Sequence, residues 1–402
     1  MMISPTRFDK SKYTHVCVLG SGGFGKVNLY LLNGTNTFRA VKFAKSFDIK
    51  GKELHDFIRE VHTLYSNQHP TIVHVFNYGI PETDYTFNPW IELEFIPCGT
   101  AFDLMKSYLE EDIEWNEGDP TVLHIILFGI AYSLAFLHHR NVIHRDVKST
   151  NVLLDDNLEP KLSDFGFARE LKPNDDISGF PHTVNYAAPE LLQIKPYTNK
   201  VDVYSFGMMV FELSTLSVPF EGMSKTHIIE EVISGRIPKI DPNKSPYYLL
   251  YQQCCSFQPE RRPTMWEISN TLNNMSREIS GIDLKRFDKY KDDMTFYDND
   301  QNIKYPFNEA CECGTLTHLE NAAERNPRAM YQIGWLYYQG ICVEKDLNTA
   351  AEYFRTAGYL NDHLAMQSFL NMVNSHEILM TDEIENDIEE FKDRLCEFYD
   401  DE

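Results

Sequence analysis

Two short motifs near the middle of the chain place acidic, basic and amide side chains close together. Residues 144–151 read H-R-D-V-K-S-T-N, and a D-F-G triplet begins at Asp164, thirteen residues beyond Asn151. Asp146 could accept a proton from a hydroxyl group, and Lys148 could neutralise charge on a phosphoryl group. Asn151 and Asp164 offer oxygen atoms, which a hard cation such as magnesium prefers. Together these residue types could transfer a phosphoryl group with the help of a divalent cation.

A glycine-rich segment near the start of the chain could hold phosphate groups. Residues 20–27 read G-S-G-G-F-G-K-V, the pattern G-x-G-x-x-G-x-V, between strand-like runs at residues 13–19 and 28–32. Glycines let backbone amides approach phosphate oxygens without a side-chain clash. A plain glycine-rich hairpin turn and a dinucleotide-binding fold are the alternatives. The dinucleotide-binding fold needs a helix after the glycines, whereas residues 27–32 are rich in strand formers.

The periodicity of apolar residues predicts the elements that must position these motifs. Residues 38–43 predict a strand that carries Lys42, and residues 53–65 predict a helix that carries Glu60. Residues 90–99 predict a further strand that ends in a turn. Taken alone, the lysine and the glutamate are typical of solvent-facing positions.

These motifs, in this order, resemble the catalytic core of the protein kinases. An A-P-E triplet at residues 188–190 and the sequence F-Q-P-E-R-R-P-T at residues 257–264 extend the resemblance, which covers about residues 13–275. It implies a bilobed α+β protein kinase fold, ATP and Mg²⁺ as cofactors, and a protein substrate. The alternative is a nucleotide-binding scaffold of the pseudokinase kind. Pseudokinases typically lack the strand lysine or one of the two aspartates, and all three are present here, which favours the enzyme.

The resemblance assigns a role to each matching residue. Lys42, held in place by Glu60, is expected to position the α- and β-phosphates of ATP, and Asp146 is expected to take the proton of the acceptor hydroxyl. The expected catalytic residues are Asp146, Lys148, Lys42 and Glu60, and the expected metal ligands are Asn151 and Asp164. The residues expected to bind ATP are Leu19, Gly20, Ser21, Gly22, Gly23, Phe24, Gly25, Val27, Ala40, Lys42, Glu94 and Ile96. In the same alignment Leu93 is the gatekeeper, residues 94–96 are the hinge that binds adenine, and Thr100 lies near the ribose.

Further features bear on specificity and on internal contacts. Lys148 and Thr183 resemble their counterparts in serine/threonine-directed kinases, where the threonine hydrogen-bonds near the catalytic aspartate. Residues 202–207 and 260–264 are similar to the tyrosine-kinase-like group of serine/threonine kinases. The contacts that the resemblance implies are a stack of Leu64, His144 and Phe165 and an ion pair between Glu190 and Arg262.

A regulatory site is expected in the segment after the D-F-G triplet. In similar kinases the arginine before the catalytic aspartate, here Arg145, pairs with a phosphorylated residue of this segment. Between Gly166 and Thr183, Ser178 is the sole residue with a hydroxyl side chain. We therefore expect Ser178 to be the switch, while residues 175–176, both aspartate, could already supply the negative charge.

The last third of the chain has a different character. Residues 276–308 lose apolar periodicity and predict a linker. Residues 309–402 alternate small and aromatic residues at helical spacing, and Ala-Met recurs at residues 329 and 365, a period of 36. This region resembles the Sel-one-like repeat, a relative of the tetratricopeptide helix pair, and is expected to bind a protein partner. One repeat cannot bury its own faces, so it should pack on the kinase domain or on a partner. Residues 382–399 predict a final amphipathic helix.

Composition limits the remaining classes of function. The 402 residues, 43% of them hydrophobic, predict two folded domains, and the net charge of −23 argues against binding to nucleic acid or to an anionic membrane. Residues 281–402 hold 26 acidic and 11 basic side chains, so most of this charge lies there. Scattered cysteines and the lack of an apolar leader in residues 1–13 predict a cytoplasmic protein. The longest apolar run, residues 122–137, contains His124 and is too short for a membrane span of about 20 residues, so it predicts a buried helix.

Overall fold

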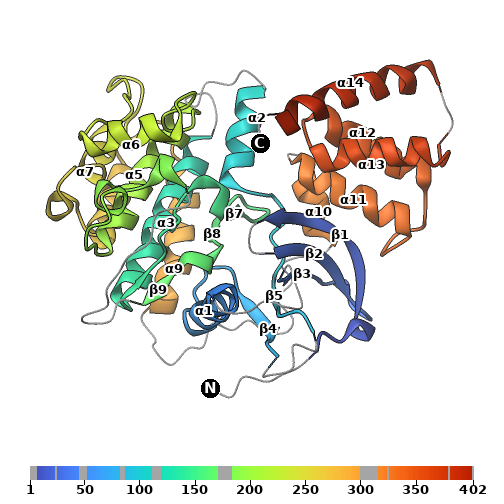
Figure 1. Cartoon of the computed structure of the whole chain (residues 1–402), viewed down its shortest axis with the longest axis horizontal. Helices are drawn as coiled ribbons and strands as arrows, with labels where there is room; N and C mark the ends of the chain where they lie inside the picture. Colours follow the sequence, from blue (N-terminus) through green and yellow to red (C-terminus); the bar gives the residue numbers. More distant parts are fainter. Residues whose placement is uncertain are drawn as a thin grey trace. The chain divides into compact units, whose positions relative to one another are not determined.

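The computed structural model describes residues 7–22, 25–44, 52–81, 87–110, 119–170, 183–298, 316–323, 326–378 and 381–400. The chain divides into two compact units, shown with the chain coloured along its length in Figure 1. The first comprises Met1–Ile49, Phe76–Gly99 and Glu309–Glu402, and the second comprises Lys50–Val75 and Thr100–Asn308. The C-terminal helices therefore belong to the same compact unit as residues 1–49 and 76–99.

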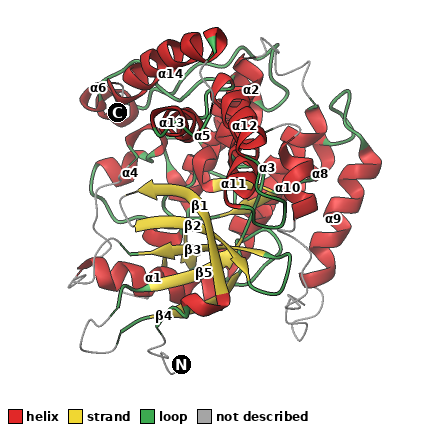
Figure 2. Ribbon diagram, turned by 90° about the vertical axis from the view of Figure 1, so that its right-hand side faces the viewer, coloured by secondary structure: helices red, strands yellow, loops and turns green. Residues whose placement is uncertain are grey.

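A sheet forms the core of the first unit. Its described strands are β1 (Tyr13–Gly22), β2 (Gly25–Leu32), β3 (Phe38–Phe43), β4 (Val75–Gly79) and β5 (Trp90–Glu94). They lie in the order β1-β2-β3-β5-β4, and the pairs β1–β2, β2–β3 and β3–β5 are antiparallel (Figure 2). The glycine-rich segment thus joins two paired strands, as predicted. A strand rather than a helix follows the glycines, so the dinucleotide-binding alternative is wrong.

Helices dominate the second unit. They are α1 (Lys52–Ser66), α2 (Ala101–Glu110), α3 (Pro120–His139), α4 (Pro189–Leu192), α5 (Lys200–Thr215), α6 (Lys225–Ile233), α7 (Tyr248–Cys254), α8 (Met265–Met275) and α9 (Leu284–Asp298). Short strands pair as β6 (Val142–Ile143) with β9 (Arg169–Glu170) and as β7 (Val152–Leu154) with β8 (Pro160–Leu162). In the part of the chain that is described, α3 alone is long and apolar enough to span a membrane, and 78% of its most apolar stretch is buried. The apolar run is therefore a core helix, as predicted.

Helix α9 corrects the prediction of a linker at residues 276–308. Phe287, Tyr290 and Met294 lie on one face of α9 and are almost fully buried. The ring of Phe287 contacts the rings of His124 and Phe128 on α3, with centroids 4.9 and 5.2 Å apart. These three apolar residues, spaced by three and four positions, are the helical signal that the polar composition of this segment concealed.

The C-terminal region of the first unit is all α. Its helices are α10 (Leu316–Ala323), α11 (Pro327–Gln339), α12 (Leu347–Tyr359), α13 (His363–Asn374) and α14 (Asp382–Asp400), and each contacts the next. Side chains of Asn326, Asp346 and Asp362 accept hydrogen bonds from the first turns of α11, α12 and α13, so each of these three helices begins at a polar cap. A Cβ atom at Gly334 would collide with Phe354, which explains the small residue in this aromatic helix.

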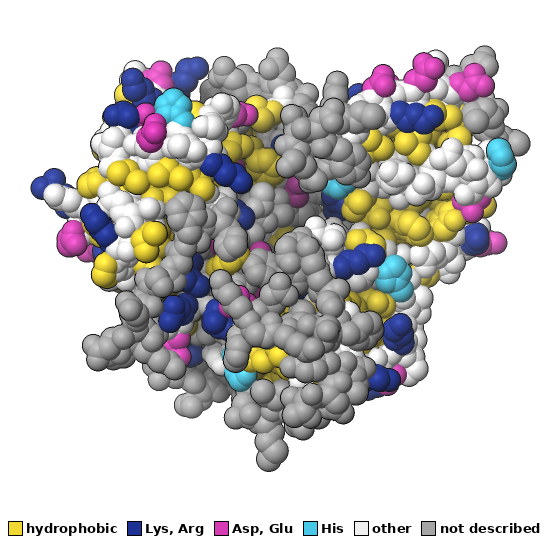
Figure 3. Space-filling view, in the orientation of Figure 1, with side chains coloured by type: hydrophobic (Ala, Val, Ile, Leu, Met, Phe, Trp, Pro, Cys, Tyr) yellow, Lys and Arg dark blue, Asp and Glu magenta, His cyan; other side chains and the backbone are white. Residues whose placement is uncertain are grey.

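The last helix carries much of the acidic charge of this region. Along α14 the acidic residues Glu385, Glu389 and Asp393 are exposed. Figure 3 shows acidic side chains along this helix, with basic ones between them. Phe391 and Leu395 are buried on the opposite side. The helix is therefore amphipathic, as predicted.

Candidate active site

A buried carboxylate on α5 anchors the loop that carries the H-R-D motif. Asp202 is fully buried, and its two oxygens accept hydrogen bonds from the main-chain N–H groups of His144 and Arg145, at 2.9 and 2.8 Å. His138 Nε2 on α3 lies 2.9 Å from the same carboxylate. Burial alone would raise the pKa of Asp202, but these hydrogen bonds and the neighbouring histidines hold it below its usual value. Asp202 is therefore ionised, and its carboxylate holds the main chain of the H-R-D loop at His144 and Arg145.

Three side chains of the loop and of the segment after it form a closed hydrogen-bonded triangle. Thr183 Oγ1 donates to Asp146 Oδ1 at 3.0 Å, and Lys148 Nζ lies 3.0 Å from Thr183 Oγ1. Lys148 Nζ also pairs with Asp146 Oδ2 at 2.8 Å. Asp146 is buried, whereas Lys148 is partly exposed. The predicted contact of Thr183 with Asp146 is confirmed, and the triangle brings a carboxylate and an ammonium group together at one place.

Asn151 and Asp164 have the chemistry that a divalent cation requires. The Asn151 Nδ2 group donates to the main-chain oxygen and to Oδ2 of Asp146, at 2.8 and 2.9 Å, so its Oδ1 atom is left to act as a ligand. Ser163, next to Asp164, donates both its N–H and its hydroxyl to the Asn151 carbonyl at 2.9 Å. Within the described ranges no cluster of three or more His, Cys, Asp or Glu side chains could hold a metal. The side-chain oxygens of Asn151 and Asp164 are of the kind that a hard cation prefers.

Two residues beside the reactive groups adopt positive φ angles. Arg145 has φ of 66° and Asp164 has φ of 56°, values that cost a residue other than glycine about 1–3 kcal/mol. The Arg145 guanidinium donates to the Phe167 carbonyl at 2.6 Å and to the Tyr197 hydroxyl at 3.0 Å, both neutral acceptors. The regulatory residue expected at Ser178 lies outside the described residues.

The contact between His144 and Phe165 that was expected from the sequence is present in the second unit. The rings of His144 and Phe165 meet edge to face with centroids 4.8 Å apart, and Leu64 on α1 is buried. Helix α1 contacts the short turn that contains Phe165. Glu60 lies on the same helix and is 3% exposed. The helix that carries the predicted partner of Lys42 is thus packed against the D-F-G turn.

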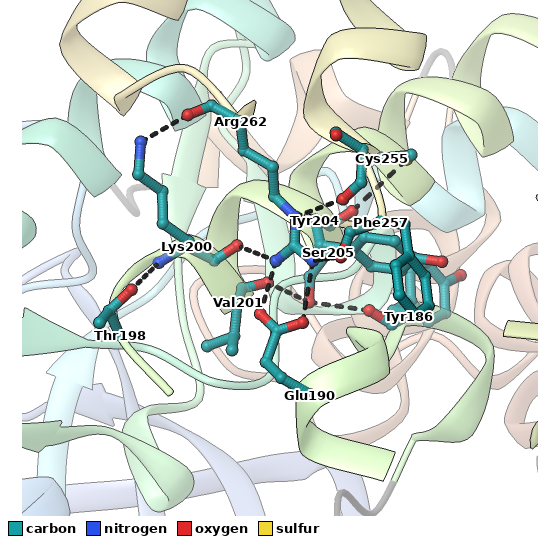
Figure 4. A network of polar contacts seen from close by, with 11 residues as sticks. Tyr186, Glu190, Thr198, Lys200, Val201, Tyr204, Ser205, Cys255, Phe257 and Arg262 are labelled. Carbon is teal, nitrogen blue, oxygen red and sulfur yellow. Dashed lines mark hydrogen bonds and ion pairs between the residues drawn. The ribbon is translucent and has the colours of Figure 1, made fainter. Parts of the chain in front are cut away.

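Arg262 and Glu190 form the predicted ion pair, which Figure 4 shows in its network. The pair is bidentate, with Nη1–Oε1 and Nη2–Oε2 distances of 2.6 and 2.8 Å, and the Arg262 side chain is fully buried. The remaining N–H groups of Arg262 donate to the carbonyls of Ser256, Lys200 and Phe257. All five guanidinium donors are therefore satisfied, which is the condition for a buried arginine to stabilise the fold.

The predicted nucleotide-binding residues lie on the sheet of the first unit. Lys42 lies on β3, paired with Val27 on β2 and Ile91 on β5, and is 8% exposed. A Cβ atom at Gly25, which has φ of 151°, would lie 2.0 Å from the carbonyl oxygen of Phe43, so no other residue fits there. Leu19, Gly20, Ser21 and Gly22 lie on β1, Gly25 and Val27 on β2, and Ala40 and Lys42 on β3, whereas Gly23 and Phe24 fall outside the described residues. Glu94 ends β5, and Ile96 follows it in the expected hinge.

Two polar pairs of the second unit were not anticipated from the sequence. Asp202 was noted only as the first residue of a stretch similar to the tyrosine-kinase-like group. Glu212 on α5 is fully buried and accepts a 2.6 Å hydrogen bond from the Tyr186 hydroxyl. Burial raises the pKa of Glu212. An acidic residue inside a strongly apolar helix was the available signal for both, because a buried carboxylate requires partners.

Comparison with known proteins agrees with this geometry. A protein kinase domain model matches residues 13–272. A probable serine/threonine-protein kinase of Dictyostelium discoideum is 35% identical over 259 residues, which make up 63% of this chain and 19% of the relative. The dual specificity protein kinase pyk3 of the same organism is 28% identical over 303 residues, 74% of this chain and 21% of the relative. The tyrosine-protein kinase Srms of Mus musculus is 32% identical over 273 residues, 65% of this chain and 51% of the relative.

These matches cover most of this chain but a smaller part of each relative. The chain spans about a fifth of the length of the two Dictyostelium relatives and about half of the mouse relative. The residues matched by the kinase domain model make up more than half of the chain, and they include both reactive motifs and the glycine-rich hairpin. On these grounds, the chain belongs to the protein kinase family.

Proposed function

We propose that this chain is an ATP-dependent protein kinase that transfers the γ-phosphate to serine and threonine hydroxyls. The observation that carries the proposal is the triangle of Asp146, Lys148 and Thr183. A carboxylate next to an ammonium group can accept a hydroxyl proton while the cation balances charge on the transferred phosphoryl group. The lysine and the threonine are the residues that resemble serine/threonine-directed kinases, and the relatives include enzymes named for each hydroxyl class.

Each predicted residue has a distinct task in this proposal. Asp146 orients the acceptor hydroxyl and takes its proton, and Lys148 stabilises the phosphoryl group in transfer. Lys42, with Glu60 as its expected partner, positions the α- and β-phosphates. Bound ATP with Mg²⁺ supplies the phosphoryl group and the cation that neutralises charge between the β- and γ-phosphates. Asn151 and Asp164 would hold that cation, so the protein would contribute chiefly positioning and electrostatics.

The direct test is transfer of labelled γ-phosphate from ATP to a generic basic protein, followed by identification of the modified amino acid. Label on serine and threonine supports the proposal, and label confined to tyrosine overturns the assignment of hydroxyl class. The alternative function is a nucleotide-binding scaffold that recruits partners through the repeat region. It predicts binding of ATP without any transfer, whereas the intact Asp146 triangle and the presence of Lys42 and Asp164 favour the enzyme.

The wider setting of the enzyme is also a proposal. We assign the catalytic region to the tyrosine-kinase-like group and residues 309–402 to the Sel-one-like repeats, since α11 and α13 begin at equivalent Ala-Met positions. The repeat region is proposed to bind a protein partner. We further propose that the protein is cytoplasmic and, because of its charge of −23, does not bind nucleic acid or membranes.

Lys42→Met is expected to leave no more than about a tenth of wild-type turnover. The buried lysine on β3 contributes charge toward the phosphates, and methionine of similar length preserves the packing. Steady-state rates of phosphoryl transfer measure the effect. Lys225→Met on α6, where the lysine is exposed and has no assigned role, is the control and should keep the wild-type rate. A fast Lys42→Met enzyme would show that this lysine has no role in the reaction.

Asp164→Asn is expected to remove the dependence of nucleotide binding on divalent cation. An amide is a poorer ligand for a hard cation than a carboxylate. Binding of a fluorescent ATP analogue with and without Mg²⁺ measures the effect. Wild type should bind far more tightly with the cation, and the variant should bind with similar affinity in both conditions. Unchanged cation dependence in the variant would exclude Asp164 as the ligand.

Phosphorylation of Ser178 is expected to activate the enzyme. A phosphate adds a charge of about −1.5 to −2 and can pair with Arg145, whose guanidinium donates to two neutral acceptors in the structure. Ser178→Ala and phosphatase-treated wild type should both be slower than phosphorylated wild type. Equal rates in all three would favour constitutive charge from residues 175–176.

A further inference from the structure

Helix α11 of the repeat region, near its two ends, contacts the main chain of two other segments of the first unit. At its start, Asn326 donates from Nδ2 to the main-chain oxygen of Cys98. At its end, Gln339 donates from Nε2 to the main-chain oxygen of Val16, at 2.6 Å. Cys98 follows the expected hinge, and Val16 lies on β1, the strand that leads into the glycine-rich turn. One helix therefore connects the two backbone segments that are expected to enclose the nucleotide.

The contact at Asn326 uses the whole side chain. Its Oδ1 atom accepts hydrogen bonds from the N–H groups of Arg328 and Ala329, at 2.8 and 3.3 Å, and so caps α11. Its Nδ2 atom binds the Cys98 carbonyl, 228 positions earlier in the sequence. Asn326 is 7% exposed and Cys98 is 4% exposed. Asn326 therefore caps its own helix with one atom and binds, with the other, the main chain at Cys98, which lies two residues past the expected hinge.

The contact at Gln339 meets an irregularity of β1. His15 pairs with Tyr30 and Cys17 pairs with Leu29, so the register skips Val16. A bulged residue of this kind is left out of the ladder, and its carbonyl is available to another partner. Gln339 supplies that partner from an exposed position. The same strand continues from the bulge to Gly22 in the glycine-rich segment. The part of β1 that is expected to approach the phosphates therefore starts at Val16, where Gln339 binds.

Strand β1 and helix α11 contact each other, and residues of both are buried. Cys17 on β1 is 2% exposed, and Tyr331 on α11 is 3% exposed. Burial raises the pKa of the Cys17 thiol, and the charges of Arg328 and Asp362 in the repeat region act on it. β1 is an edge strand of the sheet, and edges of this kind are commonly covered by another element. Here α11 is that cover.

We infer that Asn326 and Gln339 are positioning residues of the nucleotide site, through which the repeat region sets the affinity of the small lobe for ATP. They act through the backbone of Cys98 and Val16 and do not touch the nucleotide themselves. The inference rests on the proposed function, because the hinge and the glycine-rich turn are assigned to ATP on that basis. The repeat region is then part of the nucleotide-binding half of the enzyme as well as a surface for partners.

The test uses substitutions that remove a donor and keep size and shape. Asn326→Asp retains the cap of α11, since aspartate caps as well as asparagine, but it cannot donate to Cys98. Gln339→Glu likewise keeps the size of the side chain but cannot donate to the Val16 carbonyl. The matched controls are Asn348→Asp on α12 and Gln367→Glu on α13, both at exposed positions. The full chain is used throughout, with dissociation constants for a fluorescent ATP analogue and KM values for ATP and for a basic protein substrate.

Asn326→Asp is expected to weaken nucleotide binding by roughly threefold to tenfold, the range for loss of one buried hydrogen bond. KM for ATP should rise by a similar factor, with KM for the protein substrate unchanged. Gln339→Glu should act in the same direction with a smaller effect, because its position is exposed. Both control variants should match wild type. Asn326→Ser also caps the helix, and its short side chain has no amide group to reach the Cys98 carbonyl, so it provides the measurement if the aspartate variant does not fold.

The outcomes separate this inference from the proposed function. Wild-type affinity for the nucleotide in folded Asn326→Asp and Asn326→Ser, even with a lower melting temperature, would reduce the contact to structural support and overturn the inference. A lower fraction of active enzyme with unchanged KM for ATP would likewise show that the contact only supports the fold, and would overturn the inference. Failure of the wild-type chain to bind any ATP analogue would overturn the proposed function, and the inference with it.

Discussion

Asp146→Asn is expected to lower the rate of phosphoryl transfer by about a hundredfold to ten-thousandfold, the range for loss of a general base. The carboxylate accepts hydrogen bonds from Thr183 on one oxygen and from Asn151 on the other, and it pairs with Lys148. An amide can present only one oxygen to these donors, and its NH₂ group faces a donor in either orientation. The variant therefore loses both the base and the order of the residues around it.

Nucleotide binding should survive this substitution, because Asp146 is assigned to the acceptor hydroxyl. Single-turnover transfer to a basic protein and binding of a fluorescent ATP analogue are measured on the same preparation. Asp241→Asn, at an exposed turn of the second unit, is the matched control and should transfer at the wild-type rate. Transfer by Asp146→Asn within a factor of ten of wild type would refute its assignment as the base.

Arg262→Met is expected to destabilise the folded chain by about 3–5 kcal/mol, the cost of removing one partner from a buried ion pair. Glu190 would remain buried with its charge uncompensated, and the carbonyls of Ser256, Lys200 and Phe257 would each lose a donor. The midpoint of chemical denaturation, followed by far-ultraviolet circular dichroism, measures the loss. The denaturation midpoint of Arg262→Lys should lie between those of wild type and Arg262→Met, because lysine keeps the charge but lacks the planar guanidinium group.

The chain offers a control that separates burial from geometry. Arg236 and Glu231 form an ion pair with the same bidentate arrangement, at 2.6 and 2.7 Å, on the surface of the protein. Arg236→Met should leave the denaturation midpoint almost unchanged, since water and salt screen an exposed pair. Equal losses for the two variants would show that burial does not determine the strength of the Arg262 pair.

Residues close together in a motif could be placed from the sequence because local sequence dictates their geometry. The H-R-D loop holds Asp146, Lys148 and Asn151 within a few positions, and their mutual contacts follow from one short turn. The α+β kinase fold and the pair of Glu190 with Arg262 are likewise confirmed. These predictions required the order of motifs, in addition to their spacing.

The features that were missed depend on partners far along the chain. Asp202 supports the H-R-D loop from α5, at a distance of more than fifty residues, and nothing in its own neighbourhood indicates which groups it binds. The contact of Asn326 with Cys98 depends on how the repeat region packs, which no local pattern encodes. Helix α9 was hidden for a different reason, since its polar residues outnumber the three apolar ones that hold it in place.

Helix α9 also alters where this enzyme can be divided without damage. The family match ends at residue 272, but α9 lies beyond it and covers His124 and Phe128 in the core of the large lobe. Helix α9 packs so closely on α3 that a methyl group at Gly129 would collide with Tyr290. A catalytic fragment cut at the family boundary would expose this apolar surface to water and to other copies of itself. The helical unit that carries the H-R-D loop therefore extends beyond the residue at which the family match ends, and it includes α9.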